Sequence, residues 1–476
     1  MATSRIKAPE FPESTEWINT EQPVLLSNYR GKVILLDFWS YCQVSCLQSQ
    51  IDLQYLESKF SDGLVVIGIH SPKFSHEHER YAVEQAIGRQ QVRHPVINDS
   101  SYAMWKRFRI KQAPTLVIID TEGYILGALS GIGRRQQVEG LIHNNLMHAE
   151  IKDTRNTTPF PFKSPSSSAK VLSYPGQVLA TADRIYISDS GHNRVLECNH
   201  EGKITRRFGT SIPGHLDGEL EEASFSNPQG LEKIGDYLFV ADTGNHSIRR
   251  IHIPRGDVNT VIGNGRPATV TAQDYSDPAV AQLNCPWALH HHKGSLYISL
   301  AGSHQVWRWQ MSMNHLGPVV GNGKEGLRDG ISTESEFAQP CGISSRSEGL
   351  YIADASSSAI RSVRMPDIKV TTLIGTSVND FGHIDGPANS AKLQHPMDIA
   401  YDEKRNLLWI CDTYNNRLKY MQLGSNTVAT LDLEGLDEPG GMSLLDNYLW
   451  VANTNQHEIT RLDLMNGSAE IIRVHE

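Results

Sequence analysis

Two patterns of apolar and polar positions divide this chain. Between residues 31 and 148, short apolar runs alternate with stretches in which apolar residues recur every three or four positions. After about residue 171 the pattern changes to short runs with a period of two, separated by Gly, Pro, Asn and Asp. We therefore expect an α/β domain followed by an all-β domain.

The first pattern predicts a set of alternating strands and helices. Apolar runs predict strands at residues 31–39, 65–69, 95–97 and 115–120, with a hairpin partner at 124–126. Helical spacing predicts helices at residues 44–60, 77–90, 102–108 and 135–148. In the first helix, Leu47, Ile51 and Tyr55 recur at steps of four, and Leu56 and Phe60 follow on the adjoining row, so these residues indicate its apolar face. Strands alternating with helices and ending in a hairpin favour an α/β sandwich.

The second pattern is a repeat with six copies. Each copy is an aromatic-aliphatic run that ends in Asp or a substitute for it, at Asp189, Asp242, Leu300, Asp354, Asp412 and Asn453. A Pro precedes this position by 14 residues in five copies and by 16 in the fifth. Six small β units in series predict a six-bladed β-propeller over residues 171–476.

Two polar features accompany the repeat. Four residues after the Asp, five copies carry Asn or His, and Ser358 is the exception, so we expect each Asp and its Asn or His to fix a tight turn. Three inter-blade loops contain an Asp-Gly pair, at Asp217, Asp329 and Asp385. We expect the turns and these loops to share one face of the propeller and to contact a protein partner. The candidate partner-binding residues are Asp217, Asp329, Asp385, Asp189, Asp242, Asp354 and Asp412.

Metal binding by the repeated aspartates is the alternative interpretation. Turn formation accounts for these residues without a ligand, so we predict no metal site and no cofactor. The tract His290–His292 is expected to lie in a surface turn rather than to bind metal. Trp307 and Trp309 are expected to pack in the core rather than to stack on bases.

The net charge, the apolar runs and the cysteine content of the chain argue against several classes of protein. The formal net charge is −9 and the pI about 6.1, which counts against nucleic-acid binding. No apolar run is long enough to span a membrane, and the first residues lack an apolar signal region, so we expect a cytoplasmic protein. In that compartment the six cysteines are not a disulfide framework. Residues 151–170 are rich in Ser, Thr and Pro and predict a linker between residues 1–150 and the propeller.

Specific motifs add two resemblances. Asp37-Phe38-Trp39, Cys46 and Ala113-Pro114-Thr115 resemble the thioredoxin fold, and the six repeats with their Asp-Gly loops resemble NHL-repeat propellers. The whole chain therefore resembles the NHL-repeat-containing protein 2 family. This resemblance implies a thioredoxin-like domain followed by a six-bladed NHL-type propeller. It also implies a buried acid at Asp37 and a cis bond before Pro114, and it places the nucleophilic thiol at position 43 and its resolving partner at Cys46.

Position 43, however, is Gln43, and the second thiol is Cys42, one residue out of register. Three interpretations stay open. The pair Cys42 and Cys46 exchanges disulfides off register, or the fold is kept for binding without turnover, or a single thiol is reactive. The first hypothesis is a thiol–disulfide oxidoreductase whose propeller presents a protein partner. The alternatives are a non-enzymatic protein-binding scaffold and, with less support, an RNA-binding propeller.

Overall fold

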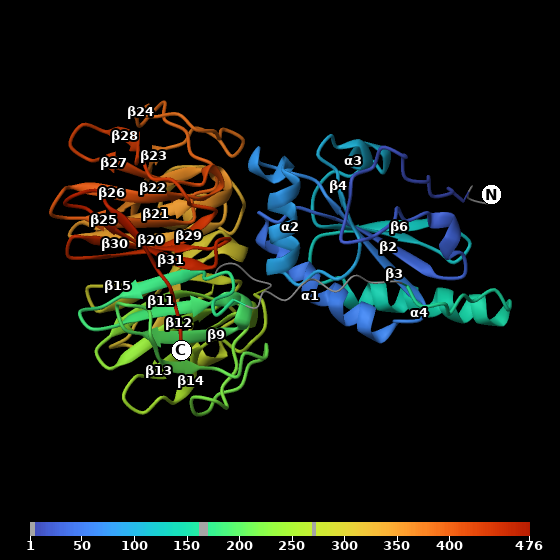
Figure 1. Cartoon of the computed structure of the whole chain (residues 1–476), viewed down its shortest axis with the longest axis horizontal. Helices are drawn as coiled ribbons and strands as arrows, with labels where there is room; N and C mark the ends of the chain where they lie inside the picture. Colours follow the sequence, from blue (N-terminus) through green and yellow to red (C-terminus); the bar gives the residue numbers. More distant parts are fainter. Residues whose placement is uncertain (1–4, 161–169, 269–272) are drawn as a thin grey trace. The chain divides into compact units, whose positions relative to one another are not determined.

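The computed structural model describes residues 5–160, 170–268 and 273–476. The chain divides into two compact units, residues 1–167 and 168–476, which are coloured blue to cyan and green to red in Figure 1.

Unit 1 is an α/β sheet with the predicted elements. Its strands, in sheet order, are β1 Trp17–Ile18, β4 Val96–Asn98, β3 Leu64–His70, β2 Val33–Trp39, β5 Thr115–Ile119 and β6 Ile125–Ser130. The helices are α1 Val44–Lys59, α2 Arg80–Arg89, α3 Ala103–Arg107 and α4 Arg135–Ile151. Strands β2, β3 and β4 are parallel and β5 is antiparallel to β2, which confirms the thioredoxin-like fold.

The central strand β2 is buried along its whole length because both faces of the sheet are covered. One face packs Ile34, Leu36 and Phe38 into one core, and the other packs Val33 and Leu35 into a second core with residues of α1 and α4. Asp37 and Trp39 alternate onto this second face, because successive strand residues point to opposite sides. The helix α1 therefore covers Asp37.

The predicted apolar face of α1 was right only in part. Ile51 and Tyr55 are 51% and 42% exposed, whereas Leu56 is buried and Phe60 packs against the second core, as predicted. Ser49, Gln50 and Leu53 also point inward. The inward face is partly polar because it meets buried polar groups of the sheet, so hydrophobic spacing marked it only in part.

Part of the predicted linker belongs to unit 1. Helix α4 continues to Ile151, and Phe160 is buried in the first core with its ring 5.1 Å from that of Tyr29. The backbone N–H of Asn156 also donates to the carbonyl of Gly31. The rest of the predicted linker, residues 161–169, lies outside the described residues.

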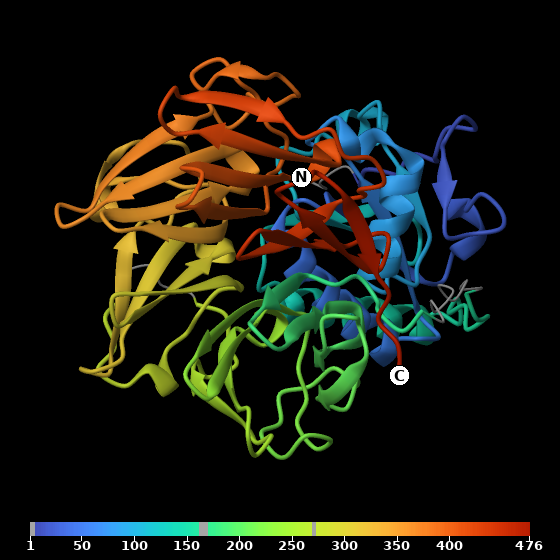
Figure 2. The same ribbon diagram turned by 60° about the vertical axis from the view of Figure 1, so that its left-hand side comes forward.

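Unit 2 consists of six antiparallel sheets, which confirms the six-bladed propeller. Blade 1 consists of β7 Gln177–Ala180, β8 Ile185–Asp189, β9 Arg194–Cys198 and β10 Ile204–Phe208. Blade 2 consists of β11 Pro228–Ile234, β12 Tyr237–Asp242, β13 Ser247–His252 and β14 Val258–Ile262. Blade 3 consists of β15 Pro286–His292, β16 Ser295–Leu300, β17 Gln305–Gln310 and β18 His315–Val320. Blade 4 consists of β19 Gly330–Ile331, β20 Pro340–Arg346, β21 Gly349–Asp354, β22 Ala359–Arg364 and β23 Lys369–Ile374. Blade 5 consists of β24 Gly386–Pro387, β25 Asp398–Asp402, β26 Leu407–Asp412, β27 Arg417–Gln422 and β28 Thr427–Thr430. Blade 6 consists of β29 Pro439–Leu445, β30 Tyr448–Asn453, β31 Glu458–Asp463 and β32 Ala469–Ile472. In Figure 2 the sheets follow one another in chain order, from green to red.

Two sequence predictions concern blade 3, and the structure contradicts one of them and confirms the other. The tract His290–His292 ends strand β15 rather than forming a turn, and His290 Nε2 lies 2.8 Å from Ser345 Oγ. The sequence did not predict this end of the strand, because strands are recognised from their apolar positions and the tract consists of three consecutive polar residues. Trp307 and Trp309 are buried in a blade core, as predicted.

The Asn, His or Ser after each turn joins its blade to the next one. All six residues have left-handed backbone conformations, with φ between 50° and 59°. Their side chains accept the backbone N–H of the residue that precedes the repeat Pro of the following blade, over 2.8 to 3.2 Å. The pairs are Asn193 with Asn227, His246 with Cys285, His304 with Gln339, Ser358 with His395, Asn416 with Glu438 and His457 with Tyr174. We call these six hydrogen bonds the blade latches. The left-handed backbone of these residues fits the expected turn, whereas their hydrogen bonds to the next blade were not predicted.

The last latch closes the ring. Besides the His457–Tyr174 latch, Thr454 Oγ1 donates to the carbonyl of Pro175, as Ser190 and Thr243 do to the repeat prolines of their next blades. Each sheet is built from consecutive strands, so the first and last blades are joined by contacts between two separate sheets. The carbonyl of Gly202 also accepts the N–H of His475.

The latch at His246 predicts a pH-dependent stability. Its Nδ1 accepts a hydrogen bond, so the ring must be neutral, and burial lowers its pKa to about 4. Because the folded value lies below the unfolded value of about 6.5, this contribution is complete above pH 6.5 and is lost as the pH falls toward 4. His246→Asn keeps an acceptor, as Asn193 and Asn416 do. It should therefore reduce the loss of unfolding free energy between pH 7 and 4.5 by about 2 kcal/mol.

Urea unfolding at a series of pH values, followed by circular dichroism, measures this effect. His246→Ala serves as the control, because it removes both the acceptor and the titrating group. It should lower stability at pH 7 by about 1–3 kcal/mol and share the weaker pH dependence of His246→Asn. An unchanged pH dependence in His246→Asn would contradict the assignment of the acid-sensitive group.

Candidate functional site

The loop that leads into α1 carries the predicted thiol site. Strand β2 ends at Trp39, and α1 begins at Val44, with Gln43 as its N-cap residue in extended conformation. Gln43 is partly exposed, whereas Tyr41 and Cys42 are buried. The position at the helix N-terminus, where a thiol would be activated, therefore holds an amide.

Cys42 faces inward. It is 3% exposed, its Sγ lies 3.1 Å from Ser40 Oγ, and its backbone N–H donates to Glu77 Oε1 over 3.3 Å. Burial raises the pKa of the Cys42 thiol well above its usual value, and the negative charge of Glu77 adds to the effect. A protonated, buried thiol is a weak nucleophile.

Glu77 is a buried carboxylate that the sequence analysis missed. It accepts hydrogen bonds from Ser40 Oγ at 2.6 Å and from the backbone N–H groups of Lys73 and Phe74 at 2.8 and 2.9 Å. His70 Nε2 lies 3.5 Å from its Oε1. Burial alone would raise the pKa of Glu77, but His70 and these donors outweigh it and lower the pKa to about 2. Glu77 therefore fixes the loop before α1 and keeps a negative charge beside Cys42.

Cys46 lies one turn inside α1 and is fully buried. Its thiol donates to Gln43 Oε1 over 3.5 Å, and burial raises its pKa. In the part of the chain that the structure describes, neither Cys42 nor Cys46 forms a disulfide.

Asp37 is the buried acid that the resemblance implied. It is fully buried on the α1 side of the sheet, and Gln50 Nε2 donates to its Oδ2 over 2.7 Å. Burial raises the pKa of Asp37 to about 7, against the opposing effects of His94 and Gln50. The Ala113–Pro114 bond is cis, as expected. Thr115 pairs with Phe38, so Pro114 lies beside the end of β2 that leads to Gln43.

The burial of both thiols predicts slow alkylation. Native protein treated with iodoacetamide should modify Cys42 and Cys46 much more slowly than urea-unfolded protein, with Cys42 ahead of Cys46 because only Cys42 retains any exposed surface. Time-resolved peptide mass mapping measures both rates. Rapid native labelling of either residue, or faster labelling of Cys46, would contradict the described loop.

The aspartates that end the repeat strands are structural. Asp189, Asp242, Asp354 and Asp412 are fully buried. Each accepts a backbone N–H from the segment before its own blade's first strand, over 2.6 to 2.8 Å. With no exposed surface, they cannot contact a partner in this structure. Their candidate role in partner binding is therefore corrected to fixing the blade entry.

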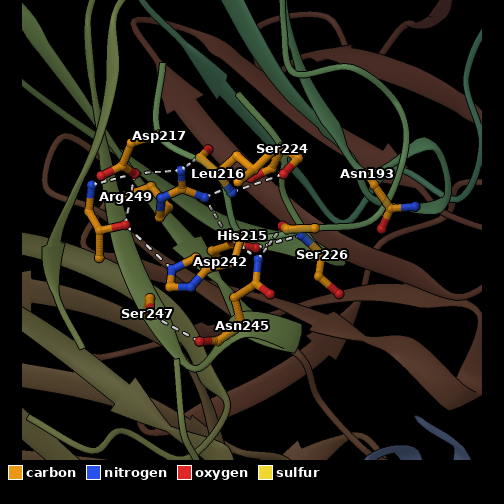
Figure 3. Close-up of polar contacts among 12 residues, drawn as sticks. Asn193, His215, Leu216, Asp217, Ser224, Ser226, Asp242, Asn245, Ser247 and Arg249 are labelled. Atoms are coloured by element: carbon orange, nitrogen blue, oxygen red, sulfur yellow. Dashed lines mark hydrogen bonds and ion pairs between the residues drawn. The ribbon is translucent and has the colours of Figure 1, made fainter. Parts of the chain in front are cut away.

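Three blades place a buried cation between this aspartate and the loop aspartate. Arg249 donates to Asp242 at 2.9 Å and to Asp217 at 2.8 Å (Figure 3). Arg361 lies in the same way between Asp354 and Asp329, and Lys419 bonds Asp385 at 2.5 Å. The side chains of the three cations are fully buried, whereas those of the loop aspartates are 44% to 47% exposed. We call each such group a cation bracket.

The brackets hold the loops beside the turns, as the sequence predicted for these two features. Each loop aspartate also accepts the N–H and hydroxyl of a Thr in the outermost strand of its blade: Thr260, Thr372 or Thr430. The loops then continue along those outer strands, as β19 beside β23 and β24 beside β28. The loop aspartates thus have a structural role, and their contact with a partner stays a prediction.

Blade 3 shows what replaces a bracket. Leu300 and Trp307 occupy the positions of Asp242 and Arg249, and both pack in one apolar core, with the ring of Tyr275 5.9 Å from that of Trp307. The acid and the cation have thus been exchanged together for apolar residues, which is the replacement that a buried ion pair tolerates.

A cavity of about 240 Å³ lies among the inner strands of the propeller. Its polar side chains mostly satisfy backbone N–H groups of the next blade. Ser443 and Ser344 accept from Ala180 and Tyr401, and Asp398 accepts from Met442. Among the described residues, no group of three or more His, Cys, Asp or Glu side chains could hold a metal ion. The cavity is thus lined by groups that hold the ring together.

The chain matches known proteins in both halves. A family model, Thioredoxin_8, described as Thioredoxin-like, matches residues 31–125. NHL repeat-containing protein 2 of Bos taurus is 32% identical over 98% of this chain and 71% of its own length. The chain belongs to the NHL repeat-containing protein 2 family. The Homo sapiens member is also 32% identical, over 98% of this chain and 72% of its own length.

The name of one plant relative includes a cellular compartment. Protein SUPPRESSOR OF QUENCHING 1, chloroplastic, of Arabidopsis thaliana is 32% identical over 96% of this chain and 47% of its own length. Within the described residues, no helix is both long and apolar enough to cross a membrane. The cytoplasmic location of this family member stays a prediction.

Proposed function

We propose that this protein is a protein-binding scaffold whose thioredoxin-like domain does not turn over disulfides as a Cys-x-x-Cys enzyme. The observation that carries the proposal is Gln43 at the N-cap of α1, in place of a thiol. Disulfide exchange begins with attack by a thiolate, and an amide cannot supply it.

In the reduced protein, the remaining thiols do not replace the nucleophile that is missing at position 43. Cys42 and Cys46 are buried, and burial raises both pKa values. Ionisation of Cys42 would also place a second negative charge beside Glu77, which keeps the first one. Both effects oppose formation of a thiolate.

A surface suited to a partner remains in unit 2. Its Asp-Gly loops expose Leu216 and Ile384, which are 63% and 47% exposed, directly before the loop aspartates. We assign the protein partner of the propeller to these exposed loop side chains rather than to the buried aspartates. The acidic net charge counts against RNA as the partner.

One observation favours a second function, thiol–disulfide exchange through Cys42 and Cys46. The acid Asp37, with its pKa raised to about 7, lies close enough to Cys46 for its charge to affect the thiol. In that reaction the two thiols lose two protons and two electrons to form a 42–46 disulfide, and a substrate disulfide is reduced to two thiols. A bridge would require the α-carbons of Cys42 and Cys46 to lie within about 7 Å of each other.

A reductase assay separates the two functions. The full chain is incubated with insulin and a thiol reductant, beside Cys46→Ser as the baseline, and a second sample is mildly oxidised and mapped by mass spectrometry. We expect no turnover above the baseline and no 42–46 bridge. Turnover that Cys46→Ser abolishes, together with a mapped bridge, would replace the scaffold by the oxidoreductase.

A further inference from the structure

The cavity among the inner strands of the propeller contains an acid whose charge its structural role does not explain. Glu232 of β11 lines this cavity, four residues after the repeat Pro of blade 2. The backbone N–H of His291 in blade 3 donates to its carboxyl group. Glu232 therefore helps to join two blades, as other side chains of the cavity do.

The equivalent positions of two other blades show that this link does not need an acid. Ser344 and Ser443 also lie four residues after their repeat prolines. Their hydroxyls accept the backbone N–H groups of Tyr401 and Ala180 in the next blades, over 2.9 and 3.1 Å. A neutral hydroxyl thus makes the same link in blades 4 and 6. The acid in blade 2 needs a further explanation, because removing a carboxylate from water costs free energy.

Within the described part of the cavity, Glu232 has no counter-charge. None of the described residues that line the cavity is a Lys or an Arg. Burial raises the pKa of Glu232 to about 8, and the N–H of His291 opposes this effect only in part. Burial also lowers the pKa of His290, which lines the cavity, to about 4, so this imidazole is uncharged at pH 7. Buried charges are normally paired, and the partner that Glu232 lacks is a cation.

A second acid makes the cavity more negative. Asp398 of blade 5 is buried and accepts hydrogen bonds from Gln177 Nε2 and the backbone N–H of Met442, over 3.0 and 2.7 Å. Burial raises its pKa to about 6, so most of it is ionised at pH 7. Its charge favours a cation over an anion in the same cavity. A metal ion fits less well, because the described residues include no group of three or more His, Cys, Asp or Glu side chains that could hold one.

The rest of the cavity wall is mostly aliphatic, with Leu231, Leu289, Ile343 and Met442 among the lining residues. The volume of about 240 Å³ equals the space of about eight water molecules. Pockets for drug-sized ligands usually exceed about 300 Å³, so a ligand of this cavity must be small. Apolar walls with a few polar groups are typical of sites for organic molecules.

We propose that this cavity binds a small aliphatic amine, whose ammonium group pairs with the Glu232 carboxylate and whose alkyl chain contacts the aliphatic wall. The carboxylate has two oxygens, so it can accept the N–H of His291 and an ammonium N–H together. The uncharged His290 ring adds no opposing charge. This binding function is separate from the scaffold function, which uses exposed loops rather than the inner strands.

Titration with butylammonium chloride tests the site. The probes 1-butanol and sodium pentanoate carry the same alkyl chain on a neutral and an anionic group. The full chain is labelled with ¹³C-methyl methionine, and the signal of the cavity residue Met442 is identified with Met442→Leu. Butylammonium should shift this signal saturably, whereas Met313, which is 65% exposed, should not respond. Butylammonium should bind at least about tenfold more tightly than 1-butanol, because it adds a hydrogen bond to a charged group.

Two substitutions separate the charge of Glu232 from its structural role. Glu232→Gln keeps a carbonyl oxygen for the N–H of His291, and Glu232→Ser introduces the hydroxyl that blades 4 and 6 use. Both should lower the affinity for butylammonium at least about tenfold, and circular dichroism checks that each variant is folded. Glu201→Gln, at an exposed turn of blade 1, is the matched control and should bind as the unaltered chain does.

Binding should also release a proton. At pH 7 most of Glu232 is protonated because its pKa is raised, and an ammonium group pairs only with the ionised form. Calorimetry in buffers of different ionisation enthalpy should therefore detect up to one proton released per ligand, and Glu232→Gln should abolish this release. Four results would each overturn the proposal: no shift of the Met442 signal, equal affinity for 1-butanol, tighter binding of pentanoate, or unchanged affinity in both Glu232 variants. None of them depends on disulfide turnover or on a protein partner.

Discussion

Asp242→Ala is expected to lower the free energy of unfolding of the propeller by about 3–5 kcal/mol, because it leaves the buried Arg249 with only the half-exposed Asp217 as a counter-charge. The same substitution removes the acceptor of the Ser226 N–H, which adds to the loss. Urea unfolding of the full chain, compared with Asp183→Ala at an exposed turn of blade 1, measures the difference.

The apolar pair in blade 3 suggests a double substitution in blade 2 that should restore the lost stability. Asp242→Leu combined with Arg249→Trp reproduces the Leu300 and Trp307 pair, and it should recover most of the stability that either single substitution loses. The reason is that removal of both charges also removes the cost of burying them, a cost already visible in Asp242, whose pKa burial raises to about 6 despite Arg249. A double variant whose loss equals the sum of the two single losses would show that the acid and the cation are not coupled.

The sequence predicted the propeller well because each blade repeats the same local signals. The repeat Pro, the aromatic-aliphatic strand and the following turn lie within one blade, so their spacing could be recognised directly. The blade latches could not be predicted in this way. Asn193 bonds Asn227, 34 residues further on, and His246 bonds Cys285, 39 residues further on. Such pairs become neighbours only when two blades stand side by side.

The thiol site was predicted only in part, for a similar reason. Cys46, Asp37 and Gln43 could be placed because they lie on one strand and the helix that follows it. Glu77 was missed because it reaches the loop from a separate 3₁₀ turn, His76–His78, which the sequence analysis had merged with the next helix. Gln50 was missed because it lies on the inward face of α1, where the analysis expected apolar residues.

Gln43→Cys is expected to give the thioredoxin-like domain disulfide reductase activity. The new thiol would stand at the N-cap of α1, near roughly half a unit of positive dipole charge, on a residue that is partly exposed. Its pKa should therefore fall below the free value of about 8.5. The thiol of Cys46 already lies 3.5 Å from the Gln43 side chain, so a resolving partner is in reach. We expect insulin reduction at least about tenfold above that of the unaltered chain, since an accessible thiolate replaces an amide.

Two further variants show whether the gain comes from the restored pair. Cys46→Ser in the Gln43→Cys background should abolish it, because the mixed disulfide then lacks a resolving thiol. Gln43→Ser removes the amide without adding a thiol and should leave the activity at the level of the unaltered chain. If the unaltered chain were already as active as Gln43→Cys, Cys42 would be the working nucleophile. The loop would then have to open away from Glu77 during the reaction, and the register that places the nucleophile at position 43 would be wrong.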